Sequence, residues 1–268
     1  MVDQRNVLRA QDGAHAEQND YVVGSPHLRH PELRHDIERR LAEIVADRIA
    51  RTGACRAVEI GAGHGTFTQT LVDAGATVLV SEVSEASADH LRRTFAGDDR
   101  VEVLHDLTGE AVLAREDEWD LAVMISVLHH IPDYLRFLTM LQERIAEDGA
   151  IFTAQDPLFY PRRSRSSHLA SRGAYFTWRL AQGSYRRGLA TRVRRLRGVY
   201  DDTAPSDLVE YHVMRQGCDE EAIRSLLAHS FDVEVFTYWS TQSPLFQRLL
   251  QGTALRTDFG VVASHHRR

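Results

Sequence analysis

The chain has 268 residues, of which 43% are hydrophobic and 26% charged, and its formal net charge is −6. This is the composition of an ordinary globular protein, and the length suits one domain with a substantial core. No apolar run reaches the roughly 18 residues of a transmembrane helix. Two cysteines, Cys55 and Cys218, give neither a disulfide framework nor the spacing of a metal site. We therefore expect a cytoplasmic protein without a bound metal.

Residues 1–50 are expected to form an N-terminal helical segment. Pro31 suits the first turn of a helix. Apolar residues then recur at helical spacing, namely Leu33, Ile37, Leu41, Ile44, Val45 and Ile49. Three nearby histidines, His27, His30 and His35, lack companion cysteines and an H-E-x-x-H pattern, so they do not indicate a metal site.

Residues 57–66 predict a strand, a tight turn and the start of a helix. The apolar run ends near Glu59, and Gly61, Gly63 and Gly65 follow at alternate positions. Glycine adopts unusual dihedral angles and lets a ligand approach the backbone closely, and a helix start offers unpaired N–H groups. A nucleotide-type ligand is therefore expected here. The spacing is G-x-G-x-G, whereas dinucleotide-binding turns use G-x-G-x-x-G.

Strands and helices alternate after this turn. We expect strands at 77–81, 101–104, 119–126 and 150–154, and helices at 67–74, 85–95 and 134–145. Such alternation predicts a right-handed parallel sheet, in which ligands bind beyond the C-terminal ends of the strands. Polar residues fall at or near those ends: Glu59, Glu82, Asp106, Ser126 and Asp156.

Two motifs resemble those of the class I S-adenosylmethionine (SAM) dependent methyltransferases. Residues 59–65 match the first motif of that family, E/D-x-G-x-G-x-G, and residues 128–133 match its L-H-H-[IL]-P-D segment. The resemblance covers residues 51–157 with specific motifs and the C-terminus more weakly. It implies an α/β fold with a Rossmann-like seven-stranded sheet, mostly parallel with the last strand antiparallel. A helix at 219–228 and strands at 231–239 and 258–263 would complete it.

The resemblance also implies the contacts that hold SAM. Glu82 would bind the ribose, since a carboxylate can accept hydrogen bonds from two vicinal hydroxyls. Asp106 would accept the adenine amino group, Leu107 would offer its backbone N–H to the ring, and Gly63 would lie beside the amino-acid end. The expected cofactor-binding residues are Glu59, Gly61, Gly63, Gly65, Glu82, Asp106, Leu107 and Ser126. The alternatives are a solvated strand-end acid for Glu82 and a helix cap for Asp106.

Two candidate proton acceptors for the reaction follow the fourth predicted strand. His129 and His130 follow it, and an imidazole titrates near neutral pH, so either histidine could act as the general base. The alternative is that the pair only braces a loop. Further candidates are Asp156, Tyr160, His168, Tyr211 and His212.

Residues 157–214 are too long for a plain surface loop, so they are expected to form a helical lid. Apolar residues recur at helical intervals, namely Trp178, Tyr185, Leu189, Val193, Leu196 and Tyr200. Residues 157–200 contain eleven arginines and no acidic residue. Three interpretations stay open: a solvated helix face, a clamp on an anionic acceptor, or contact with nucleic acid or an anionic membrane. The acidic remainder of the chain argues against nucleic acid.

The sequence thus predicts four segments: the N-terminal segment 1–50 with a flap at 21–30, the SAM-binding core 51–156, the lid 157–214, and the C-terminal part 215–268. The resemblance implies a methyltransferase that uses SAM to methylate a small molecule, and we expect a hydroxyl of a specialised natural product. N- or C-methylation and RNA methylation are alternatives. A SAM-binding protein without methyl transfer, such as a partner subunit or a cyclase, is an alternative of another class. The sequence indicates no oligomeric state.

Overall fold

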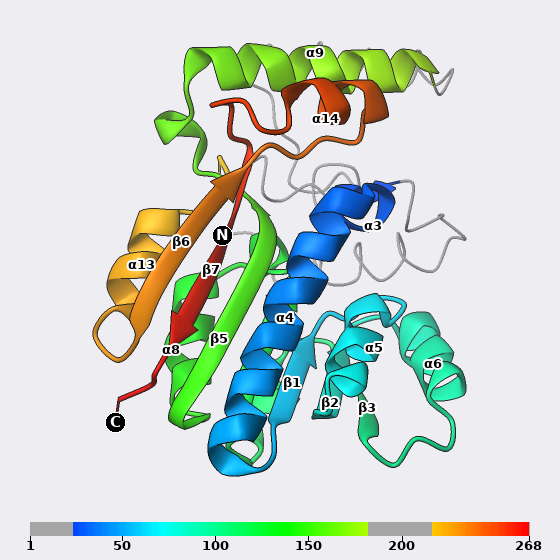
Figure 1. Ribbon diagram of the computed structural model, residues 1–268, viewed down its shortest axis with the longest axis vertical. Coiled ribbons are helices and arrows are strands. Elements are labelled where there is room, and N and C mark those ends of the chain that lie inside the picture. Colours follow the sequence, from blue (N-terminus) through cyan, green and yellow to red (C-terminus); the bar gives the residue numbers. More distant parts are fainter. Residues whose placement is uncertain (1–23, 182–215, 268) are drawn as a thin grey trace.

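The computed structural model describes residues 24–181 and 216–267, which are built around one seven-stranded sheet of order β3-β2-β1-β4-β5-β7-β6 (Figure 1). The first five strands run parallel, and β7 is antiparallel to both of its neighbours. This confirms the predicted fold class. The strands are β1 (Arg56–Ile60), β2 (Thr77–Glu82), β3 (Val101–His105), β4 (Trp119–Ile125), β5 (Ile145–Pro157), β6 (Asp232–Tyr238) and β7 (Asp258–Ser264).

Helices cover both faces of the sheet, and β4 shows why. Leu121 and Val123 pack into one hydrophobic cluster, whereas Ala122 and Met124 pack into the other, because successive side chains of a strand point to opposite faces. The first cluster includes residues of α4 (Pro31–Thr52), α5 (Thr66–Asp73) and α6 (Glu85–Thr94). The second includes residues of α7 (Glu110–Ala114), α8 (Tyr134–Gln142) and α13 (Glu220–Leu227).

Further helical elements lie at the end of the sheet where the parallel strands finish. They are α3 (Pro26–Arg29), η1 (Leu128–His130), η2 (Tyr160–Arg162), α9 (Arg165–Ala181) and α14 (Pro244–Leu250), and Figure 1 shows α9 and α14 beyond the ends of β5 and β6. Helix α9 occupies the first part of the segment for which we predicted helices. The remainder of that segment lies outside the described residues, including Tyr185, Leu189, Val193, Leu196, Tyr200, Tyr211 and His212. Residues 21–23 of the predicted flap also lie outside them, and helix α3 forms within the rest of it.

One predicted boundary is wrong, and two helices were not predicted. Helix α8 ends at Gln142 and β5 begins at Ile145, because Ile145 pairs with Trp119 across a register shift of the β4–β5 ladder. Helix α7 was not predicted because it is only five residues long. Helix α14 was also missed, although Ser243 followed by Pro244 is a recognisable helix start. Within the described ranges, no helix combines the length and the apolar character needed to cross a membrane.

Candidate active site

The glycine-rich turn after β1 forms as predicted, with all three glycines in the left-handed region. Their φ angles are 71° at Gly61, 57° at Gly63 and 84° at Gly65, a conformation that costs glycine little. Packing adds a second requirement. A Cβ on Gly61 would lie 2.6 Å from Cγ2 of Val127, so a larger residue would push into the loop after β4.

Glu82 joins the end of β2 to this turn. Its side chain is buried, Oε2 accepts a hydrogen bond from the backbone N–H of Gly63 at 2.8 Å, and Oε1 accepts one from Ser84 at 3.1 Å. Burial raises the pKa of Glu82, and the backbone N–H donors act in the opposite direction. The carboxylate therefore supports the turn directly, and its remaining lone pairs can still accept hydroxyl donors. Ribose binding by Glu82 stays a prediction.

Glu59 is a second buried carboxylate beside the turn. The hydroxyl of Thr68 on α5 donates a hydrogen bond to it, and its side chain lines the same cavity as Gly61 and Gly63. Burial raises the pKa of Glu59 to about 7, opposed by the Thr68 hydrogen bond and reinforced by the charge of Glu82. A positive group placed beside Glu59 would lower this pKa and favour the carboxylate form.

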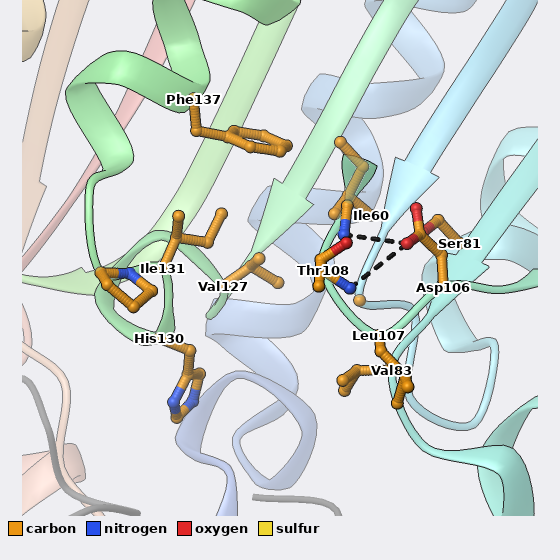
Figure 2. A pocket seen from close by; sticks show the side chains of 13 residues that line it. Ile60, Ser81, Val83, Asp106, Leu107, Thr108, Val127, His130, Ile131 and Phe137 are labelled. Carbon is orange, nitrogen blue, oxygen red and sulfur yellow. Dashed lines mark hydrogen bonds between the residues drawn. The ribbon is translucent and has the colours of Figure 1, made fainter. Parts of the chain in front are cut away.

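The apolar part of the site is a cavity on the other side of the turn (Figure 2). Its lining includes Ile60, Val83, Leu107, Val127, Ile131 and Phe137. Asp106 also lines it, but its carboxylate is engaged in the loop that leads into α7. Oδ1 accepts the backbone N–H groups of Thr108 at 3.2 Å and Gly109 at 3.0 Å, and Oδ2 accepts that of Val112 at 3.1 Å. The helix-capping interpretation of Asp106 is thus realised, and adenine binding stays a prediction.

Two adjoining cavities make up the site. The apolar cavity and the polar cavity beside the glycine turn share Gly61, Val83, Val127 and His130 as lining residues. The polar cavity is lined further by residues that include Glu59, Gly63, Glu82 and Ser126. An elongated space with one apolar end and one charged end suits a ligand that has an aromatic ring and a polar tail. The structure therefore places every predicted cofactor residue except Gly65 on the wall of one cavity or the other.

Backbone strain marks the ends of two neighbouring strands. Ser126 after β4 and Gln155 in β5 have φ angles of 61° and 64°, in the region that non-glycine residues rarely adopt. The N–H of Ser126 donates to the carbonyl of Ala154 at 2.8 Å, so the two strained residues lie on adjacent strands. The β5–β7 register also shifts between Thr153 and Asp156. Such strain and bulges concentrate at functional sites.

His129 pairs with Asp156 across these strand ends. Nδ1 of His129 lies 2.7 Å from Oδ1 of Asp156, and the backbone N–H of His129 donates to the same oxygen at 3.1 Å. Both side chains are buried, Asp156 completely. A carboxylate at Nδ1 favours the tautomer with a proton on that nitrogen, so Nε2 is left as the proton acceptor. His129 is thus paired with a buried carboxylate.

His130 occupies a different position. It lines both cavities, and its ring centroid lies 4.0 Å from that of His129. Tyr160 and His168, the other described candidates, contact each other: Nε2 of His168 lies 2.9 Å from the carbonyl oxygen of Tyr160. In the described part of the chain, no three histidine, cysteine or acidic side chains are grouped as metal ligands.

Several polar residues near the site were not predicted. Asp258 at the start of β7 is half-buried, desolvation raises its pKa to about 7, and Nε2 of Gln155 donates to its Oδ1 at 3.2 Å. Arg163 has its Nε and one Nη buried without a hydrogen-bond partner among the described residues. His27 of α3 lines the polar cavity. In the sequence, His27 was considered only as a metal ligand and rejected, and Arg163 was one of the eleven arginines of residues 157–200.

A family model described as Methyltransferase domain matches residues 27–187. The ubiquinone biosynthesis O-methyltransferase of Sinorhizobium fredii (strain NBRC 101917 / NGR234) is 28% identical over 100 residues, which span 37% of this chain and 40% of that relative. The N-methyltransferase NodS from Bradyrhizobium japonicum WM9, solved in complex with S-adenosylhomocysteine (SAH), has a TM-score of 0.55 at 12% identity, covering 97% of this chain and 98% of that one.

A second solved structure gives the same result for the fold. Magnesium protoporphyrin IX methyltransferase from Synechocystis PCC 6803, solved with bound SAH, has a TM-score of 0.55 at 13% identity. The match covers 97% of this chain and 99% of the other. At such low identities, these likenesses establish the shared fold.

Proposed function

This protein belongs to the methyltransferase domain family, and we propose that it transfers the methyl group of SAM to a hydroxyl oxygen of a small-molecule acceptor. One observation carries the choice of a hydroxyl: the buried His129–Asp156 pair, whose imidazole has its centroid 4.0 Å from that of His130 on the cavity wall. A hydroxyl is a weak nucleophile until its proton is removed, so its methylation benefits from a positioned base. The matching stretch of an O-methyltransferase supports the same choice.

The proposed pose of SAM follows the chemistry of the two cavities. Adenine lies in the apolar cavity, beside Leu107 and Phe137. Three backbone N–H groups already bond to Asp106, and a carboxylate offers about four acceptor positions. One position therefore remains for the adenine amino group. The ribose hydroxyls bond to Glu82, and the amino-acid end follows the glycine turn past Glu59.

The reaction is an in-line displacement at the methyl carbon. The acceptor oxygen forms a bond to that carbon while the carbon–sulfur bond breaks, and the positive sulfonium becomes the neutral thioether of SAH. The hydroxyl proton passes to Nε2 of His129. Asp156 holds the ring in the required tautomer and stabilises the imidazolium that forms. The rate also increases because the acceptor oxygen is held about 3 Å from the methyl carbon.

We propose that the segment after β5 covers the acceptor. Arg163 follows η2, and its guanidinium lies over the ring of Tyr160, with 5.2 Å from Cζ to the ring centroid. A buried guanidinium nitrogen with no partner among the described residues suits a carbonyl, carboxylate or phosphate oxygen. This supports an acceptor that carries such an oxygen group in addition to the hydroxyl.

The test is a methylation assay with isotope-labelled SAM and a panel of phenols, alcohols, hydroxy acids and amines. We expect SAH release with hydroxyl compounds, and NMR of the product should show a new O-methyl group. Transfer only to amines or carbon acids would overturn the choice of oxygen. Tight SAH binding without transfer to any compound would instead favour a SAM-binding protein that performs no methyl transfer.

A further inference from the structure

His27 lies on the short helix α3 and reaches the polar cavity from outside the glycine-rich turn. Its side chain is 6% exposed and lines the polar cavity together with Gly61, Gly63 and His64. The imidazole stacks on Phe67 in the first turn of α5, with ring centroids 6.0 Å apart and an interplanar angle of 27°. The ring therefore lies over the helix start that follows the glycine turn.

One nitrogen of this buried ring has no hydrogen-bond partner in the described part of the chain. Nδ1 of His27 forms no hydrogen bond with any residue of 24–181 or 216–267. Leaving a buried polar atom unpaired is destabilising, so an apolar residue would suit a simple packing role better. Burial and, to a smaller extent, the nearby His129 lower the pKa of His27 to about 3, so the ring is neutral at physiological pH.

The helix that carries His27 is anchored at its other end. Nη1 of Arg29 donates to the carbonyl of Gln242 at 3.2 Å, and Nε2 of His30 lies 2.8 Å from the carbonyl oxygen of Thr241. These bonds tie α3 to the loop between β6 and α14. The position of His27 is thus set by contacts between α3 and residues more than 200 positions further along the chain, independently of any ligand.

We propose that His27 hydrogen-bonds the amino-acid end of SAM through Nδ1. This inference rests on the proposed placement of the cofactor, with the ribose at Glu82 and the amino-acid end along the glycine turn. A neutral imidazole can accept from the ammonium group or donate to the carboxylate, whichever tautomer is present. The first turn of α5 also favours a carboxylate, so the amino-acid end would be held between that turn and the ring.

The experiment compares two ligands that differ only at this end. Calorimetry measures the binding of SAH and of 5′-methylthioadenosine, which keeps the adenosine and the sulfur but lacks the amino-acid group. The variant His27→Phe keeps a flat ring against Phe67 and removes Nδ1. His27→Asn restores a hydrogen-bonding group in a smaller side chain. His35→Ala, which removes an exposed histidine of α4, is the matched control.

We expect His27→Phe to weaken SAH at least tenfold while 5′-methylthioadenosine changes less than twofold. His27→Asn should recover part of the SAH affinity, and His35→Ala should bind both ligands as the wild type does. Unchanged SAH affinity in folded His27→Phe, or an equal loss for both ligands, would overturn the assignment of His27. Failure of the wild type to bind SAH would instead overturn the proposed function, and this inference with it.

Discussion

Replacing Glu82 by alanine tests the proposed pose of the cofactor most directly. The substitution removes the carboxylate proposed to hold the ribose, and it also removes the acceptor of the backbone N–H groups of Gly63 and Ser84. We therefore expect two effects, a loss of SAH affinity and a loss of stability, which must be measured separately.

The magnitudes follow from the contacts. Charge-assisted hydrogen bonds contribute about 1–3 kcal/mol, so the dissociation constant of SAH should rise about 5- to 150-fold. In Glu82→Ala, the N–H of Gly63 loses its carboxylate partner, which should lower the free energy of unfolding by about 1–3 kcal/mol. Glu82→Gln keeps one carbonyl acceptor, so both losses should be smaller.

Calorimetry with SAH gives the affinity, and urea denaturation without ligand gives the stability. Glu85→Ala is the matched control, because Glu85 is an exposed acid three residues further along the chain. It removes the same charge without touching the turn and should leave SAH affinity unchanged. Equal SAH binding by the wild type, Glu82→Ala and Glu82→Gln would refute the role of Glu82. A matching loss in Glu85→Ala would show that net charge, rather than a contact, controls affinity.

Gly61→Val should lower SAH affinity at least tenfold in a protein that still folds, since its Cβ would lie 2.6 Å from Val127 beside the cavity; unchanged calorimetry would remove the turn from the site. The pKa of Glu59 is raised from 4.5 to about 7, so its ionisation costs stability as pH rises through that window. Urea denaturation should therefore show Glu59→Gln gaining about 3 kcal/mol over the wild type between pH 4.5 and 8, and a constant difference would contradict the shift. Asp156→Asn should lower kcat at least tenfold and leave SAH affinity within about twofold, because the carboxylate acts through His129; equal kcat values would leave His129 without a catalytic partner.

Much of the fold and half of the site follow from local sequence. The glycine spacing, the preceding Glu59 and the alternation of apolar strands with amphipathic helices are properties of short stretches. Because parallel strands all end at one edge of the sheet, Glu82, Asp106 and Ser126 could be predicted to gather there. The ends of helices and strands were predicted less accurately. Strand β5 begins at Ile145 because of a pairing with Trp119, which no local pattern reveals.

Tertiary structure decided the roles that depend on contacts between distant residues. His129 and His130 are equivalent in the sequence, and only the β4–β5 pairing brings Asp156 to His129 and leaves His130 on the cavity wall. His27 precedes the glycine turn by more than 30 residues, and its place over α5 depends on how α3 is anchored to the loop after β6. Burial, likewise, is a property of the packed molecule: the pKa of Glu59 is raised to about 7 chiefly because its side chain is buried, which composition alone does not reveal.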